Sequence, residues 1–359
     1  MTIDIAGRRL FNQRIVQSTF ERPSQVVSWF GAMQAQDWAG VKWAIALRCH
    51  AATETTIEQA IVNKTIIRTW LLRGTLQVVA AADIRWMLAL LAPRLLAQSA
   101  RRRKQLELQD VILARSFEVI TSVLQDHKRL TRANLLLALE QAGISIQGQR
   151  GYHILRHAGL EGLICFGPMQ DKDQTFVLLD DWVPHSKGLE HEEAVTELAR
   201  GYFSSHGPAT LQDFVWWSGL PKAQARAGLD MIQSQLYRVN LDGETYWLPL
   251  SDTTPDDMAS TAYLLPAYDE YYLGYKIRDA VLGAGYDKNA VSSGGVFRPV
   301  VVIDGQIVGT WKQALKKGSV VIDLKPLKAF TEIEYQALLT AANQYGNYLE
   351  RPVVLAQLN

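Results

Sequence analysis

Three polar side chains that stand close together are, by type and spacing, the best candidates for chemistry in this sequence. Gln34 and Gln36 are separated by one alanine, and Asp37 follows them directly. A glutamine carbonyl can orient a water molecule, but an amide cannot take up a proton as a carboxylate can. Asp37 is a secondary catalytic candidate, although its place before an apolar helical pattern at 38–47 favours a helix N-cap. Considered alone, the two glutamines are more typical of the polar end of an amphipathic helix.

The common signatures of cofactor and metal chemistry are absent from the sequence. It has no Walker A run, no GxGxxG after a strand, no HExxH and no GxSxG. His153 and His157 stand one helical turn apart, but no third ligand lies near them in the sequence. Cys49 and Cys165 are far apart and lack metal-binding spacing. We therefore expect no cofactor, no metal and no disulfide framework.

The composition is that of a globular protein. Of the 359 residues, 48% are hydrophobic and 20% are charged. The first residues lack the apolar core of a signal peptide, and no apolar run is long enough to span a membrane. The two isolated cysteines fit a reducing compartment. These observations predict a cytoplasmic protein and, without any coiled-coil pattern, a monomer.

The distribution of charge is more informative than the net charge of +1. Residues 1–160 carry 21 basic and 11 acidic side chains, whereas the rest of the chain carries 16 and 25. Such an asymmetry favours a polyanionic partner for the first half. The alternative is chance together with one basic cluster, residues 101–104, on a solvated helix face.

Residues 130–180 have a recurring order of expected elements. Thr131 is a good N-cap for a helix that ends near Gly143, and a second helix is expected over 150–161. Two short strands follow, at 163–166 and 175–179, joined by a polar loop. The order helix, turn, helix and two-stranded wing is typical of a winged helix.

Two further segments have the same order. In 208–250, two helices lead to a hairpin that turns at Asp242-Gly243, a strong two-residue turn signal. A divergent copy fits 8–80, where a wing turns at Arg73-Gly74. Its expected helices are 8–13, 23–33, 38–47 and 56–63, and its strands are 66–71 and 75–79. Long helices over 81–96 and 111–126 would join the first copy to the second.

The expected fold class is α+β, with tandem winged-helix modules and a β-rich C-terminal subdomain. We place the first, divergent module with the polar motif at 1–98, and linking helices with the second module at 99–190. The third module occupies 191–252, and 253–359 forms the β-rich subdomain with a terminal helix. A helix-turn-helix places one helix in the major groove, which favours DNA binding. Winged helices also serve as packing or protein-interaction modules, which remains an alternative.

Family resemblance gives the polar motif a function. The context Trp29-Phe30-Gly31-Ala32-Met33-Gln34-Ala35-Gln36 resembles the catalytic motif of the winged-helix DNA glycosylases typified by AlkZ and YcaQ. Three other stretches, 69–76, 264–278 and 302–311, resemble the same family. The resemblance covers nearly the whole chain, from about residue 5 to residue 350. It implies a DNA repair glycosylase that acts on double-stranded DNA containing alkylated bases.

The implied reaction is hydrolysis of the N-glycosidic bond of an alkylated purine, interstrand crosslinks included. A purine alkylated at N7 or N3 is cationic and leaves readily, so the enzyme needs to position a water and stabilise an oxocarbenium-like sugar. In the Gln-apolar-Gln form of the motif, Gln34 and Gln36 would position that water. No lysine lies in the motif to act as an amine nucleophile, which predicts a monofunctional glycosylase.

Two further groups of residues are candidates. Arg68, Arg73 and Thr75 belong to the first wing and are expected to bind DNA, and Arg73 at the hairpin turn is well placed for a phosphate. The second group consists of Tyr268, Asp269, Glu270 and Arg278. If exposed, it could contact a lesion. If buried, its acids would pair with Arg278 or Lys276 and lock the β-rich domain, and we favour this structural role.

Two other functions compete with the glycosylase interpretation. A winged-helix transcription regulator would explain the modules and the basic half, and a structural protein would pack its wings on one another.

The glycine- and serine-rich segment 286–298 is a candidate hairpin for probing a duplex, which the sequence alone does not establish.

Overall fold

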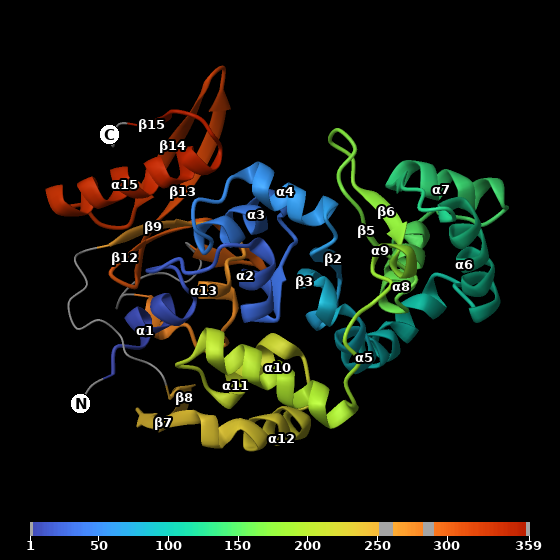
Figure 1. Ribbon diagram of the computed structural model, residues 1–359, viewed down its shortest axis with the longest axis horizontal. Helices are drawn as coiled ribbons and strands as arrows, with labels where there is room; N and C mark the ends of the chain where they lie inside the picture. Colours follow the sequence, from blue (N-terminus) through green and yellow to red (C-terminus); the bar gives the residue numbers. More distant parts are fainter. Residues whose placement is uncertain (1–2, 251–260, 283–290, 357–359) are drawn as a thin grey trace. The chain divides into compact units, whose positions relative to one another are not determined.

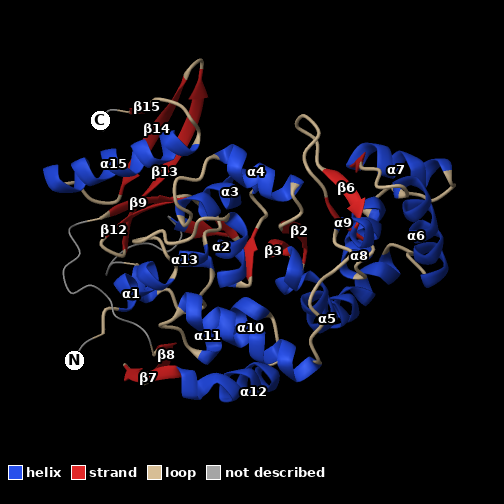
Figure 2. Ribbon diagram, in the orientation of Figure 1, coloured by secondary structure: helices blue, strands red, loops and turns tan. Residues whose placement is uncertain are grey.

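The computed structural model describes residues 3–250, 261–282 and 291–356 and has a mixed α+β fold (Figure 2). Among these residues, no helix combines the length and the apolar character needed to cross a bilayer. Cys49 and Cys165 are both buried and reduced. Burial raises the pKa of the Cys49 thiol to about 11.

Contacts divide the chain into two compact units. The terminal unit comprises residues 1–57 and 195–359, and the inserted unit comprises residues 58–194. Helix α4 (Glu54–Val62) crosses the first boundary, which falls within the segment expected as the first module. The finer division of the sequence into four segments stays a prediction.

The inserted unit is built around an antiparallel sheet. Five of its strands are joined in the order β3-β2-β5-β6-β4. The Trp70 ring lies between the sheet and α8, 4.9 Å from the ring of Phe166. The elements are β2 (Ile66–Trp70), β3 (Leu76–Ala80), α5 (Ile84–Gln105), α6 (Asp110–Leu124), β4 (Leu130–Thr131), α7 (Arg132–Gln141), α8 (Arg150–Leu160), β5 (Ile164–Phe166), β6 (Thr175–Leu178) and α9 (Leu179–Trp182).

The expected order of elements in residues 130–180 is confirmed. The Thr131 hydroxyl accepts the Asn134 N–H and caps α7, and α8 and the β5–β6 hairpin follow. In the terminal unit, α11 (Leu211–Ser218), α12 (Lys222–Ile232) and the hairpin of β7 (Leu236–Leu241) and β8 (Glu244–Pro249) repeat this order. The winged-helix arrangement of these elements stays a prediction.

A second sheet organises the C-terminal part of the terminal unit. Its strands run in the order β15-β14-β13-β12-β9, all antiparallel except the parallel pair β14–β15 (Figure 1). Helix α15 packs on β9, and the rings of Trp43, from α3 (Trp38–Leu47), and Tyr345, from α15, have their centroids 5.0 Å apart. The elements are β9 (Ala262–Leu265), β12 (Val300–Ile303), β13 (Gln306–Lys316), β14 (Ser319–Pro326), α15 (Glu332–Tyr348) and β15 (Val353–Leu355).

The N-terminal part of this unit carries the polar motif. Helix α2 was expected to run to residue 33 but ends at Phe30, because Gly31 takes a left-handed φ of 76° and the chain turns into the short strand β1. Helix α10 (His191–His206), which enters from the inserted unit, was not anticipated. The remaining elements are α1 (Ile5–Asn12), α2 (Pro23–Phe30), β1 (Ala32–Gln34), α3 (Trp38–Leu47), α13 (Glu270–Leu273), β10 (Ser292–Ser293) and β11 (Val296–Phe297).

The expected probing hairpin at 286–298 lies partly outside the described residues. From Ser292 to Phe297 it is a hairpin of β10 and β11, in which Gly294 and Gly295 take positive φ angles. Glycine is favoured there because it adopts positive φ angles without the strain that a Cβ brings.

Thr331 and Glu334 form a capping box that should make α15 sensitive to pH. The Glu334 carboxylate accepts the Thr331 N–H, and this bond, helped by Lys328, lowers the pKa of Glu334. Its stabilisation is therefore present above the pKa of an unfolded glutamate, 4.5, and is lost as pH falls through the lower folded value. In denaturant titrations, Thr331→Ala should cost about 1 kcal/mol at pH 7. The cost of Glu334→Ala should shrink towards pH 3, and a cost independent of pH would contradict this account.

Candidate active site

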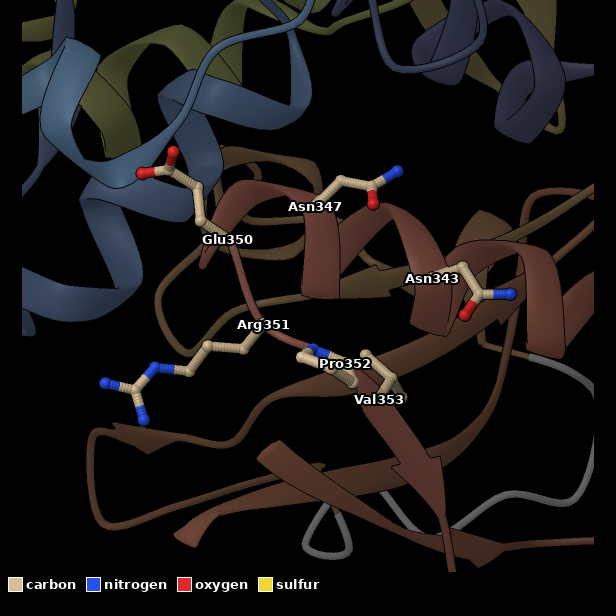
Figure 3. A pocket seen from close by; sticks show the side chains of 6 residues that line it. All are labelled: Asn343, Asn347, Glu350, Arg351, Pro352 and Val353. Atoms are coloured by element: carbon tan, nitrogen blue, oxygen red, sulfur yellow. The ribbon is translucent and has the colours of Figure 1, made fainter. Parts of the chain in front are cut away.

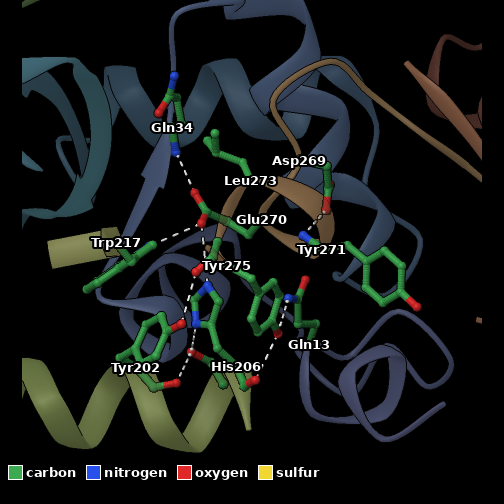
Figure 4. Close-up of polar contacts among 12 residues, drawn as sticks. Gln13, Gln34, Tyr202, His206, Trp217, Asp269, Glu270, Tyr271, Leu273 and Tyr275 are labelled. Carbon is green, nitrogen blue, oxygen red and sulfur yellow. Dashed lines mark hydrogen bonds and ion pairs between the residues drawn. The ribbon is translucent and has the colours of Figure 1, made fainter. Parts of the chain in front are cut away.

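The polar motif lies at the end of a buried strand. Gln34 closes β1 with 7% of its surface exposed, whereas Gln36 is exposed in the turn before α3. The Gln34 backbone N–H donates to Glu270 Oε1 at 2.9 Å. In Figure 4 the Gln34 side chain points away from Glu270. The Gln34 backbone is thus anchored to Glu270, and the Gln34 side-chain amide points in the opposite direction.

Glu270 makes polar contacts with three separate parts of the terminal unit. Besides the Gln34 N–H, its carboxylate accepts the Trp217 indole at 3.1 Å and lies 3.4 Å from His206 Nε2 (Figure 4). Burial lowers the pKa of His206, although its contact with Glu270 acts in the opposite direction. The His206 ring stacks on Tyr202, with 4.4 Å between centroids. Sequence reasoning did not identify Trp217 or His206, because neither lies near the motif in the chain.

Asp269 lies beside Glu270 and forms a buried ion pair with Arg48. The guanidinium donates to both carboxylate oxygens, at 2.8 and 2.9 Å. The expectation that these acids pair with Arg278 or Lys276 was wrong: Asp269 pairs with Arg48, and Glu270 with the donors described above. Burial of both acids nevertheless favours the structural role over direct contact with a lesion.

Tyr268 and Arg278 lie in an aromatic cluster. Tyr268 takes a left-handed φ of 60°, and its ring lies 5.6 Å from that of Phe297. The Arg278 guanidinium lies 5.1 Å from the Phe297 and Tyr272 rings, and its Nε donates to the Tyr272 carbonyl. Burial lowers the pKa of Arg278. Ring contacts and the hydrogen bond to the Tyr272 carbonyl therefore hold this side chain.

Asp37 caps helix α3. Its side chain accepts the Gly40 N–H at 3.1 Å, as the sequence favoured. A Cβ on Gly40 would lie 2.7 Å from the Asp37 carboxylate, so a larger residue there would force the cap to shift. Further along α3, the Trp43 indole donates to the Leu264 carbonyl and ties the helix to strand β9. The turn that holds Gln36 is therefore fixed at its C-terminal side.

Substitutions of Asp37 separate capping from catalysis. Asp37→Asn should change the free energy of unfolding by less than about 0.5 kcal/mol, because asparagine caps as well as aspartate, whereas Asp37→Ala should cost about 1 kcal/mol. If the carboxylate only caps, the asparagine variant keeps the wild-type rate of base release. A strong loss of rate in Asp37→Asn at unchanged stability would assign the carboxylate to the reaction.

The residues expected to bind DNA lie in the inserted unit. Arg68 is buried on β2, with its guanidinium 4.8 Å from the Phe166 ring centroid. Arg73 takes a left-handed φ of 56° in the turn between β2 and β3. The Thr75 hydroxyl donates to the Leu72 carbonyl and stabilises the same turn. Arg73 and Thr75 are half-buried, whereas Arg68 is buried, and contact of the three with DNA stays a prediction.

Two other features of the described residues lie apart from the polar motif. His157 is buried, its pKa is lowered to about 4, mainly by burial, and no group of three potential metal ligands forms within the described ranges. A shallow hollow of about 360 Å³ lies at α15 and β15, lined by Asn343, Asn347, Glu350, Arg351, Pro352 and Val353 (Figure 3). Its lining includes none of the motif residues.

Comparison with known proteins identifies the family. The model of the AlkZ-like DNA glycosylase family matches residues 27–348, and the chain belongs to this family. An interstrand DNA cross-link repair glycosylase of Streptomyces sahachiroi is 26% identical over 334 residues, which cover 85% of each chain. The structure of Streptomyces sahachiroi DNA glycosylase AlkZ superposes with a TM-score of 0.79 at 21% identity and covers 98% of both chains.

Proposed function

We propose that this protein is a DNA repair glycosylase that hydrolyses the N-glycosidic bond of alkylated, cationic purines with a water positioned by Gln34 and Gln36. The observation that carries this proposal is the arrangement of the motif in a chain of the AlkZ-like family. The Gln34 main chain is held by buried Glu270, while its amide points away from that anchor.

The chemistry of two amides suits this substrate class. A purine alkylated at N7 or N3 carries a positive charge, so its departure needs little general-acid assistance. The remaining tasks are to aim a water at the sugar carbon and to stabilise positive charge there, and carbonyl dipoles serve both. Amides cannot remove a proton as a strong base would, so normal bases are poor substrates. Without a lysine in the motif, the enzyme hydrolyses the bond and does not cleave the strand.

The DNA partner is proposed on the basis of the recurring helix-helix-hairpin units. We infer that these units are winged helices that contact duplex DNA through its phosphates, with Arg73 at the tip of the first wing. Because the Streptomyces relative is named for interstrand cross-link repair, crosslinked purines are proposed substrates beside simple alkyl adducts. A monomer acting in the cytoplasm is the simplest form consistent with this role.

The decisive experiment is a base-release assay over several lesions. Purified protein is incubated with duplexes that carry N7-methylguanine, N3-methyladenine or an N7-linked crosslink, and free base and heat-labile abasic sites are measured. Release from at least one substrate is expected. A transcription regulator would instead bind a particular sequence tightly and release nothing, and absence of release from every substrate would refute the proposed function.

A further inference from the structure

We propose that Glu270 is a positioning residue for the reaction, because it holds the Gln34 backbone and thereby sets the direction of the Gln34 side-chain amide. The inference rests on the proposed function of the motif. Glu270 is 2% exposed, and its carboxylate accepts the Gln34 backbone N–H (Figure 4), so it acts through Gln34 and not on the substrate.

The two obligatory donors that face Glu270, the Gln34 N–H and the Trp217 indole, require an acceptor on each side of this side chain. Oε1 accepts the Gln34 N–H, and Oε2 accepts the Trp217 indole and faces His206 Nε2. A glutamine at this position would have an NH₂ group on one side, opposite at least one obligatory donor. Burial of an acid is costly unless its oxygens are matched, and here both are. The cluster therefore specifies one orientation of the Gln34 peptide.

The position of Glu270 in the chain is itself fixed. The Asp269 side chain accepts the Tyr271 N–H and pairs with Arg48, which anchors the start of α13. At the other end of the turn, a Cβ on Gly274 would lie 2.6 Å from the His206 ring, so only glycine allows this close approach. Because the chain is held on both sides of Glu270, the Glu270 carboxylate has a fixed position and in turn fixes the position of the Gln34 backbone.

Asp213 provides a matched control, since it is also a fully buried carboxylate of the terminal unit. It accepts the N–H groups of Lys276 and Ile277 and forms a capping box with Thr210. These contacts stabilise α11 and the segment after α13 and do not involve the motif. Asp213→Asn should therefore reduce stability, with a far smaller effect on the rate of base release by the folded protein than Glu270→Met.

The test compares Glu270→Met, which keeps the size but removes both acceptors, with Asp213→Asn and the wild type. Three quantities are measured for each protein. They are the single-turnover rate of base release from an N7-methylguanine duplex at saturating enzyme, the affinity for that duplex, and the backbone hydrogen exchange of residues 32–36. Glu270→Met should slow release on the order of 100-fold, as misplacement of a catalytic group does. DNA affinity should stay unchanged, and the hydrogen of the Gln34 backbone N–H should exchange faster than in the wild type. Wild-type release or wild-type exchange in Glu270→Met would overturn the proposal.

A rescue experiment covers the case in which Glu270→Met does not fold. Glu270→Gln retains an acceptor for Gln34, but its NH₂ group opposes the Trp217 indole. Adding Trp217→Phe removes that opposing donor, so the double variant should release base faster than Glu270→Gln alone. Equal rates would overturn the positioning role. If the wild type releases nothing, the proposed function fails, and exchange at Gln34 still decides whether Glu270 anchors the motif.

Discussion

Replacement of Arg48 by methionine is expected to lower the free energy of unfolding by about 3–5 kcal/mol, because it leaves the Asp269 carboxylate buried without its charge partner. All five guanidinium N–H groups have acceptors. They are the two Asp269 oxygens, the Ala44 carbonyl, and the carbonyl and side-chain oxygens of Gln13. Arg48 has no exposed surface. Arg48 thus connects the ends of α1 and α3 with the start of α13.

Denaturant titration of Arg48→Met, monitored by a signal from the terminal unit, checks this expectation. Arg200→Met is the control, because the Arg200–Glu197 pair of the same unit is exposed, with 41% and 38% of the two side chains accessible. An exposed pair contributes about 0–1 kcal/mol, so the control variant should have nearly the same free energy of unfolding as the wild type. A cost below about 1 kcal/mol for Arg48→Met would contradict the structural role of the pair.

Gln34→Ala is expected to slow base release on the order of 100-fold, because a water aimed at the sugar carbon loses one of its two positioning groups. Gln36→Ala should act in the same direction. Gln36 is exposed, whereas Gln34 is 7% exposed, so only Gln34→Ala should also affect stability. Affinity for duplex DNA should remain close to that of the wild type, since phosphate contacts carry most of it.

Single-turnover rates at saturating enzyme separate this effect from binding. Gln336→Ala is a suitable control, because Gln336 is an exposed glutamine of α15 that bonds to Glu332 on the same helix. Wild-type rates in both motif variants, at unchanged affinity, would show that the reaction takes place elsewhere.

Local sequence patterns predicted most of the elements. Apolar periodicity and Thr131 placed α7, and the helix expected at 38–47 is α3 with the same bounds. Helix α10 was missed, although Val195, Leu198 and Tyr202 are buried at helical spacing and provided a signal. The order of strands in each sheet could not be predicted, because it depends on pairing between distant segments.

The site was predictable only in its local part. Gln34, Gln36 and the capping role of Asp37 follow from adjacent residues and from family resemblance. The partner of Asp269 was misassigned because Arg48 lies 221 residues away in the chain. The same holds for Glu270, whose polar contacts come from α10, α11 and β1. Buried polar networks of this kind are set by tertiary packing, which a short sequence motif does not encode.

The most direct test of the central claim is the release of N7-methylguanine from duplex DNA by the wild type and by the Gln34→Ala/Gln36→Ala double variant, at concentrations where both bind the DNA. The account predicts free base and heat-labile abasic sites with the wild type, and release by the double variant close to the spontaneous rate. Release by the double variant at the wild-type rate would contradict it.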